Sequence, residues 1–390
     1  MPWLICILVD FSVKSERYKE NDLEDHSNTI CRIHLVHHSI TQSLIKMSKP
    51  IIVIKFGTAS ITHRTGEINE AILQEIARQI SILHVDYQIV MVSSGAVGAG
   101  RGFIQNYKGT LSERKAAAAI GNPLLLAKYT QYFSKYGIVV AQSLCERQHF
   151  ANRNQFLQLK ETYQELWKNG VIPIANENDV VSNLELKFSD NDELATLIAT
   201  GFGAGTLLLC TSVGGLLDAD KNIIPFISRV DSAVLGLAND DKSSLGLGGM
   251  VSKLTYTRMA TRMGTRVVIF GMKTSNGILK ALDNQNGTSF APQEISLNSR
   301  QKWLASGSLI AGKVMVDSGA VKALTNRKSL LAVGIKKVNG SFEKGEVFEI
   351  LDEKKNVIAV ARARESSEVI SENLKTQNFE VANADEIVVL

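Results

Sequence analysis

Apolar positions recur along the chain in two different rhythms. Residues 51–54 form an unbroken β-branched run, which is typical of a strand buried on both faces of a sheet. Residues 68–85 instead repeat their apolar side chains at helical spacing. The same two patterns predict further strands at 88–92, 138–141, 171–175, 206–210 and 266–270, and further helices at 112–135, 152–168, from 190 to 200 and from 257 to 263. Strands that alternate with helices predict an α/β domain with a mainly parallel sheet.

Two local signals modify this pattern. Gly121-Asn122-Pro123 lies inside the alanine-rich stretch 112–135, where a proline predicts a break in the helix. Asn339-Gly340 lies between two apolar runs and is a hairpin-type signal. Beyond about residue 300 the chain offers short strands and turns with little helix, at 313–316, 331–338, 347–351 and 357–361. We therefore expect a second, small, β-rich domain over residues 312–390.

The first 46 residues differ from the rest. Residues 1–13 are apolar, but the run is short, lacks a basic leader and contains Asp10, so it predicts neither a membrane span nor a signal peptide. Met47 comes directly before the first clear strand, as a natural start would. We expect residues 1–46 to be an extension outside the fold and residues 47–300 to form the main domain.

Composition narrows the class of protein. The 390 residues carry a net charge of only +4, which gives no case for nucleic acid as the main partner. The four cysteines form no CxxC pair, and the histidines of the first 46 residues have no matching carboxylate or thiolate ligands. The sequence therefore predicts reduced thiols in a cytoplasmic protein, without a metal site built from protein ligands.

A glycine-rich turn precedes the helix that ends near residue 263. It reads Gly246-Leu247-Gly248-Gly249-Met250-Val251-Ser252-Lys253. Glycines let backbone N–H groups approach a phosphate, a helix N-terminus favours an anion, and lysine adds a mobile positive charge. Because no Gly-Lys-Ser/Thr follows a four-residue gap, the turn predicts nucleotide binding outside the P-loop class.

Small and polar residues follow four of the predicted strands, at Lys55-Phe56-Gly57-Thr58, Ser93-Ser94-Gly95, Asn176–Asp179 and Thr211-Ser212. Ligands of parallel sheets bind at these carboxyl ends. Taken singly, each motif has a structural interpretation: a lysine extending to solvent, close packing of small residues, or an Asx turn. Ser189–Glu193 opens a helix, where its acidic groups are suited to capping, or one carboxylate could orient lysines or a Mg²⁺ shell. Two lysines, an acidic helix start and several glycine loops together suit phosphoryl transfer, which depends mainly on positioning and charge neutralisation.

In this order the motifs resemble the glutamate 5-kinase group of the amino acid kinase family, over about residues 50–375. The resemblance implies a three-layer αβα sandwich with a mostly parallel sheet, the amino acid kinase fold, which makes residues 47–300 the catalytic domain. The tail over 312–390 resembles a PUA domain, a small C-terminal β-barrel. The activity implied is ATP-dependent phosphorylation of the γ-carboxylate of L-glutamate, the first step of proline biosynthesis.

The resemblance also implies residue roles. Lys55 and Lys253 would neutralise the transferring phosphoryl group, and Asp192 would hold both lysines. The substrate-binding residues implied are Ser94, Asn176, Asp179 and Asn191. The ATP-binding residues implied are Lys55, Gly57, Thr211, Ser212, Leu247, Gly248, Gly249, Met250, Val251, Ser252 and Lys253. The cofactors implied are ATP and Mg²⁺, with proline as feedback inhibitor, glutamate-5-semialdehyde dehydrogenase as a partner and a homo-oligomer as the assembly.

The chain departs from the family pattern on the nucleotide side. Ser212 stands where the family commonly has aspartate, Leu247 replaces a common threonine, and residues 215–220 lack the usual Thr-Ala-Asp-Pro. We expect retained activity with altered ATP affinity. Two other hypotheses remain open: another amino acid kinase, against which the Asn176–Asp179 loop argues, and an RNA-binding protein whose kinase fold is vestigial, which the PUA-like tail motivates.

Overall fold

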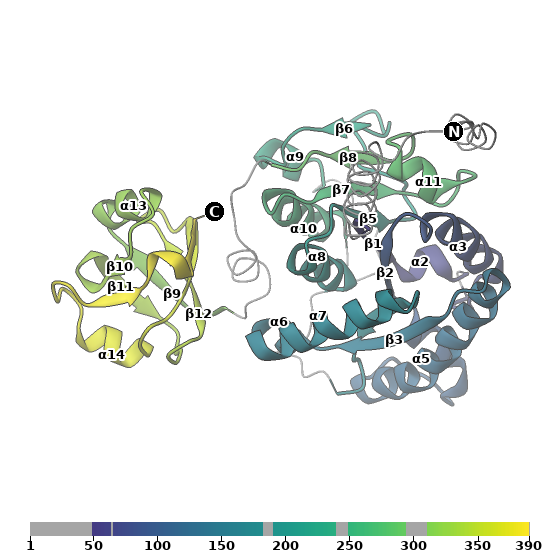
Figure 1. Cartoon of the computed structure of the whole chain (residues 1–390), viewed down its shortest axis with the longest axis horizontal. Coiled ribbons are helices and arrows are strands. Elements are labelled where there is room, and N and C mark those ends of the chain that lie inside the picture. The colour runs from purple at the N-terminus through teal and green to yellow at the C-terminus, as the bar shows by residue number, and fades with distance from the viewer. Residues whose placement is uncertain (1–48, 64, 182–189, 239–248, 294–309, 390) are drawn as a thin grey trace, which may run out of the picture. The chain divides into compact units, whose positions relative to one another are not determined.

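The structure is a computed structural model of the whole chain (Figure 1). It describes residues 49–63, 65–181, 190–238, 249–293 and 310–389. The expected extension 1–46 lies outside these residues, as do Leu247 and Gly248 of the glycine-rich turn. The domain boundaries 47–300 and 312–390 stay predictions.

An eight-stranded sheet organises the first part of the chain, in the order β3-β4-β2-β1-β5-β7-β8-β6. Its strands are β1 (Ile51–Phe56), β2 (Gln88–Ser93), β3 (Val140–Cys145), β4 (Ile172–Glu177), β5 (Thr206–Cys210), β6 (Phe226–Ile227), β7 (Arg266–Phe270) and β8 (Thr288–Phe290). The six strands from β3 to β7 pair in parallel, and β8 pairs antiparallel with β7. The parallel sheet expected from the alternating pattern is therefore confirmed.

Helices pack on both faces of this sheet (Figure 1). The longer helices are α3 (Glu70–Leu83), α5 (Leu111–Phe133), α7 (Arg153–Lys168), α8 (Asn191–Phe202) and α10 (Met250–Arg262), and the short ones are α2 (Thr58–Ile61), α4 (Ala96–Gly100), α6 (Arg147–Ala151), α9 (Ser232–Gly236) and α11 (Gly277–Leu282). Because successive strand residues face opposite ways, Ile52 and Ile54 join the core beneath α3 and α5, while Val53 joins the core beneath α7 and α8. The result is the expected three-layer αβα sandwich.

Helix α5 corrects one prediction. It runs unbroken from Leu111 to Phe133 with Pro123 inside it, so the expected break at 121–123 is wrong. The helix packs very closely on α4: a β-carbon at Gly121 would lie 1.8 Å from the Ala96 carbonyl oxygen, and one at Gly100 would lie 1.9 Å from that of Ala117. This packing and the burial of one helix face outweigh the local cost of the proline, which is about 3 kcal/mol.

The C-terminal part builds its own sheet, in the order β11-β9-β12-β13-β15, beside the two-stranded pair β10-β14. Its elements are β9 (Ile310–Val316), α13 (Ser318–Thr325), β10 (Leu330–Leu331), β11 (Ile335–Asn339), β12 (Val347–Leu351), β13 (Val357–Arg362), α14 (Ser367–Glu372), β14 (Glu380–Ala382) and β15 (Ile387–Val389). Val314, Phe342, Phe348 and Ile350 lie in its buried core. The expected β-rich second domain is confirmed.

The hairpin expected at Asn339-Gly340 is wrong. Gly340 does take a left-handed turn, with φ of 86°. However, β11 pairs with β9, and the following strand β12 pairs with β9 and β13. The chain therefore turns at Gly340 but passes over β9 before it enters the next strand.

No helix among the residues that the structure describes is long and apolar enough to cross a membrane.

Candidate active site

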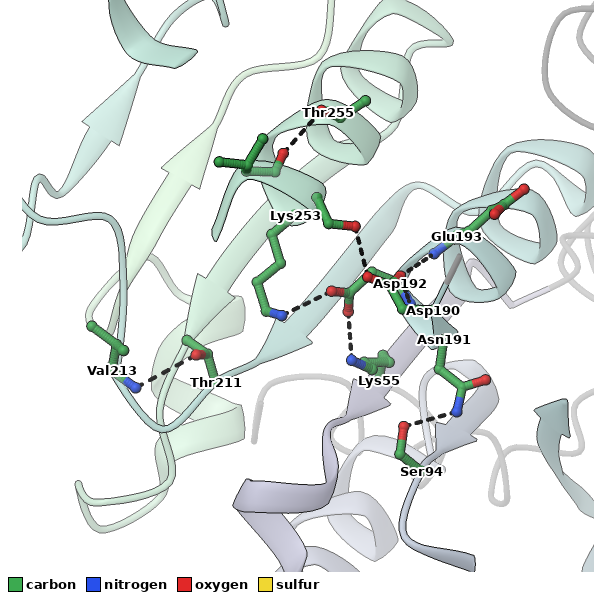
Figure 2. Close-up of polar contacts among 12 residues, drawn as sticks. Lys55, Ser94, Asp190, Asn191, Asp192, Glu193, Thr211, Val213, Lys253 and Thr255 are labelled. Atoms are coloured by element: carbon green, nitrogen blue, oxygen red, sulfur yellow. Dashed lines mark hydrogen bonds and ion pairs between the residues drawn. The ribbon is translucent and has the colours of Figure 1, made fainter. Parts of the chain in front are cut away.

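Two lysines share one buried carboxylate at the carboxyl edge of the sheet (Figure 2). Lys55 lies near the end of β1, Asp192 in the first turn of α8 and Lys253 in the first turn of α10. Lys55 Nζ is 2.6 Å from Asp192 Oδ1, and Lys253 Nζ is 2.8 Å from Asp192 Oδ2. All three side chains are buried, and Asp192 is 0% exposed. We call these residues the lysine–aspartate cluster.

Burial and the two ammonium groups act on Asp192 in opposite directions. Burial acts to raise the pKa of its carboxyl group, but the charges and hydrogen bonds of Lys55 and Lys253 outweigh burial and hold the pKa below its ordinary value. Asp192 is therefore ionised at neutral pH. Two cations and one anion leave the cluster with net positive charge, which suits a site that receives an anionic group.

The acidic start of α8 serves two purposes. Asp190 is the N-cap, and its Oδ1 accepts hydrogen bonds from the backbone N–H groups of Asp192 and Glu193, at 2.9 and 3.1 Å. Its Oδ2 accepts a hydrogen bond of 2.6 Å from the Ser252 hydroxyl, which ties α10 to α8. The capping interpretation thus holds for Asp190, whereas Asp192 orients the lysines.

A second ion pair beside the cluster was not predicted from the sequence. The Arg147 guanidinium is 2.6 Å from Glu193 Oε1, and the Tyr256 hydroxyl donates to Glu193 Oε2 at 3.1 Å. Glu193 is almost fully buried. These contacts connect α6, α8 and α10, so they help to fix the helix turns that carry Asp192 and Lys253. An acidic residue at a helix start is usually interpreted as a capping group or as a partner of the helix dipole. For this reason the sequence pattern did not predict the ion pair of Glu193.

Three of the expected substrate residues form a hydroxyl–amide chain on the other side of Asp192. The Asn191 side-chain Nδ2 donates to Ser94 Oγ at 2.8 Å and to Asn176 Oδ1 at 2.9 Å (Figure 2 shows the first bond). Both hydrogens of that amide are then used. Asn191 Oδ1 is buried and accepts no hydrogen bond from any residue that the structure describes. The hydroxyl–amide chain therefore presents a hydrogen-bond acceptor at Asn191 Oδ1 and a hydroxyl group at Ser94.

The strands explain why these residues meet. Ser94 directly follows β2, and Asn176 is the second-last residue of β4, which pairs with β2. Asn176 and Glu177 were expected in a loop, but they belong to the strand. Asp179 lies in the turn that follows β4 and is half-buried. The structure thus links Ser94, Asn191 and Asn176 by hydrogen bonds, and Asp179 lies three residues after Asn176 in the chain.

The structure describes only some of the residues that are expected to bind the nucleotide. Gly57 caps α2, and a β-carbon there would lie 3.6 Å from Lys55 Nζ, so the glycine leaves room beside the lysine.

Thr211 follows β5 and its Oγ1 accepts a hydrogen bond from Val213 N–H, while Ser212 is exposed. Gly249 is the N-cap of α10, and Met250, Val251 and Ser252 form its first turn. Leu247 and Gly248 lie outside the described residues.

The carboxylates of this region are already engaged by other side chains. Within the described ranges, no group of three His, Cys, Asp or Glu side chains is arranged to hold a metal ion. Both Asp192 oxygens face lysines, and Asp190 Oδ2 accepts from Ser252. A nucleotide-bound Mg²⁺ requires no such group, since phosphate oxygens and water supply most of its ligands. Mg²⁺ therefore stays a prediction.

Comparison with known proteins agrees with this fold. The family model described as "Amino acid kinase family" matches residues 50–271, and the PUA domain model matches residues 312–378. The chain belongs to the amino acid kinase family. Within it, the chain is similar to the glutamate 5-kinases of Moorella thermoacetica, with 37% identity over 82% of this chain and 88% of that protein, and of Thermoanaerobacter sp. strain X514, with 32% identity over 84% and 92%. Among solved structures, carbamate kinase from Giardia lamblia has a TM-score of 0.47 and 18% identity, over 63% of this chain and 99% of that one.

Proposed function

We propose that this chain phosphorylates the γ-carboxylate of L-glutamate with ATP. The observation that carries the proposal is the adjacency of two kinds of group at the start of α8. Asp192 holds the lysine pair, and the preceding residue, Asn191, belongs to the hydroxyl–amide chain. A cationic site for a phosphoryl group and a polar site for an amino acid therefore lie one residue apart. The similarity to curated glutamate 5-kinases supports the same conclusion.

The chemistry requires little of the protein beyond placement and charge. One oxygen of the substrate γ-carboxylate attacks the terminal phosphorus of ATP, the bond to the bridging oxygen breaks, and ADP leaves with the electron pair. The attacking carboxylate is already ionised at neutral pH, so no general base is needed. Lys55 and Lys253 stabilise the charge on the transferring group, and Asp192 holds both of them in place. The product is γ-glutamyl phosphate.

The hydroxyl–amide chain is suited to the amino acid end of the substrate. Because Ser94 Oγ accepts from Asn191, its own hydrogen is free to point toward a substrate carboxylate. Asn191 Oδ1 offers an acceptor for the substrate ammonium. Asp179 is assigned a further contact to the ammonium group, on the strength of the resemblance. The roles of Ser94 and Asn191 are proposals from the geometry and charge of the side chains.

ATP would place its phosphates between Gly57 and the N-terminus of α10, where glycines and a helix start leave backbone N–H groups accessible. Mg²⁺ would enter with the phosphates and add positive charge to the lysine–aspartate cluster. Thr211 and Ser212 lie on the nucleoside side of this arrangement. Since Ser212 lacks the carboxylate common in the family, we expect the substitution Ser212→Asp to change the KM for ATP.

A hydroxylamine assay tests the activity. Purified protein is incubated with ATP, Mg²⁺ and either L-glutamate or L-aspartate, and hydroxylamine converts any acyl phosphate to a coloured hydroxamate. We expect signal with glutamate and little with aspartate. Signal with aspartate alone would overturn the assignment in favour of another amino acid kinase.

Several biological consequences belong to the same proposal. Proline shares the carboxylate and ammonium groups of glutamate, so it is proposed as a competitive feedback inhibitor. The acyl phosphate product is labile, which favours transfer to a glutamate-5-semialdehyde dehydrogenase partner. A homo-oligomer, a cytoplasmic location and RNA contact through the PUA domain are carried over from the resemblance. Addition of proline to the hydroxamate assay tests the first of these, since competition would raise the KM for glutamate and leave kcat unchanged.

A further inference from the structure

The hydroxyl–amide chain continues to a residue that no motif marks. Asn176 Nδ2 donates a hydrogen bond of 3.0 Å to Oδ1 of Asn122, which lies in the middle of α5. Asn122 is 6% exposed. The sequence pattern treated this residue only as part of a helix break. The structure instead places it at the inner end of the chain Asn122–Asn176–Asn191–Ser94.

The Asn122 side chain is only half satisfied. Its Nδ2 is buried and has no hydrogen-bond partner among the residues described. An unpaired buried donor destabilises a fold, whereas an apolar side chain of the same size does not. The amide at position 122 is therefore poorly explained by stability, and its chemical contribution is the acceptor that Oδ1 offers to Asn176.

The acceptor at Asn122 Oδ1 sets the direction of hydrogen-bond donation along the hydroxyl–amide chain. An amide has a donor end and an acceptor end, and each bond fixes which end faces the next residue. With Nδ2 of Asn176 held by Asn122, Asn176 Oδ1 accepts from Asn191 Nδ2 and from the Glu177 backbone N–H. Asn191 Nδ2 is then turned inward, so its Oδ1 is left for the ligand.

We propose that Asn122 is a positioning residue for the amino acid substrate: it orients Asn176 and, through it, the Asn191 and Ser94 groups that bind that substrate. This inference rests on the proposed function, because the ligand of Asn191 and Ser94 is taken to be L-glutamate. Asn122 itself does not touch the substrate.

A neighbouring pocket allows a matched set of variants. Asn122 lines a small pocket of about 20 Å³ together with Leu125, Leu126, Tyr129 and Gln142. Asn122→Leu removes the acceptor and keeps the branching at Cγ and the number of side-chain heavy atoms. Asn122→Gln keeps an amide at the end of a side chain that is one methylene longer and extends toward this pocket. Gln142→Leu changes the polarity of the same pocket without touching the hydroxyl–amide chain, and is the control.

Steady-state kinetics separates positioning from a general structural effect. For Asn122→Leu we expect the KM for glutamate to rise about tenfold, the effect of roughly one buried hydrogen bond, with kcat and the KM for ATP within about twofold of wild type. Asn122→Gln should recover most of the loss, and Gln142→Leu should match wild type. A parallel fall in kcat and rise in both KM values, or an unchanged KM for glutamate, would overturn the proposal.

Two further measurements keep the outcome decisive. Calorimetric titration of glutamate without ATP should show the same weakening in Asn122→Leu, independently of turnover. If that variant does not fold, as judged by thermal denaturation, Asn122→Ala removes the same acceptor with a smaller side chain. If wild-type protein fails to use glutamate, the proposed function is wrong. If wild type uses it and the Asn122 variants lacking the acceptor bind it equally well, only the role of Asn122 is wrong.

Discussion

At the residue scale, the lysine–aspartate cluster places three charges where water is nearly absent. Lys55 and Lys253 are 5% and 7% exposed, so each ammonium depends on Asp192 for the solvation that water would otherwise supply. Such a cluster is costly to build. A site that must receive several phosphate charges gives a physical reason for it, since electrostatic effects are stronger where water is excluded.

Replacement of Lys253 should therefore affect turnover far more than folding. We expect Lys253→Met to lower kcat by about a thousandfold, because one of two positive charges on the transferring group is lost. Asp192 keeps Lys55 as its partner, so the fold is retained. Lys168→Met, at an exposed ion pair with Glu165, is the matched control and should leave kcat unchanged. Hydroxamate formation and thermal denaturation measure the two effects, and near-normal turnover by Lys253→Met would refute the assigned role.

The lowered pKa of Asp192 predicts how stability depends on pH. Because its folded-state pKa lies below the unfolded value of about 4, ionised Asp192 contributes stability above pH 4, and this contribution is lost as the pH falls through the folded-state pKa. Asp192→Asn removes the contribution and leaves two buried ammonium groups without their anion, at a cost of about 3 kcal/mol at pH 7. Urea unfolding at pH 7 and at pH 3 checks this. The gap between wild type and variant should narrow in acid, and a constant gap would contradict the assignment.

At the element scale, the close crossing of α4 and α5 lies next to the turn that carries Ser94. Helix α4 starts two residues after Ser94, and Gly95 between them has φ of 106°, which favours glycine. A side chain at the crossing would push α4 away from α5 and move the turn that carries Ser94. We therefore expect the packing of these two helices to affect the proposed substrate side of the site.

Gly121→Ala tests this connection. Its β-carbon would lie 1.8 Å from the Ala96 carbonyl oxygen, so the backbones must separate. We expect a loss of about 2–3 kcal/mol in the free energy of unfolding and a higher KM for glutamate. Gly102→Ala is the control, since no atom lies within 4 Å of its β-carbon position. Urea denaturation and glutamate kinetics provide both readouts; equal behaviour of the two variants would mean that the crossing does not position Ser94.

The elements also show what the sequence could predict. The strands β1, β2, β5 and β7 follow from apolar runs, because burial on both faces leaves no polar positions. The break at Pro123 and the hairpin at Asn339-Gly340 were wrong, because packing between helices and the choice of strand partner depend on residues far away in the chain. The meeting of the proposed site residues was predictable, since they lie at strand ends and helix starts that meet at one edge of the sheet. Asn122 and the Glu193 ion pair were not predictable. In the sequence, an amide side chain inside a helix and an acidic residue at a helix start are each explained by the helix itself.

At the scale of the whole molecule, the proposed catalytic residues all come from one sheet and its helices. Lys55, Asp192 and Lys253 lie on β1, α8 and α10, and the C-terminal strands form a separate sheet with a buried cluster that includes Phe342 and Phe348. The described site includes no residue beyond 293. Catalysis and the function of the PUA domain should therefore be separable.

A chain of residues 47–300 tests that separation and the predicted domain boundaries together. It contains the full eight-stranded sheet, both of its covering helix layers and every described site residue, so we expect a cooperative thermal transition and a kcat within about threefold of the full-length protein. A second chain, residues 47–390, isolates the effect of removing the first 46 residues and should match the full-length protein in both measurements. Loss of activity in both truncated chains would show that residues 1–46 contribute to the enzyme. Loss only in the chain that ends at residue 300 would instead assign the PUA domain a part in catalysis, and the two parts would then have to be treated as one functional unit.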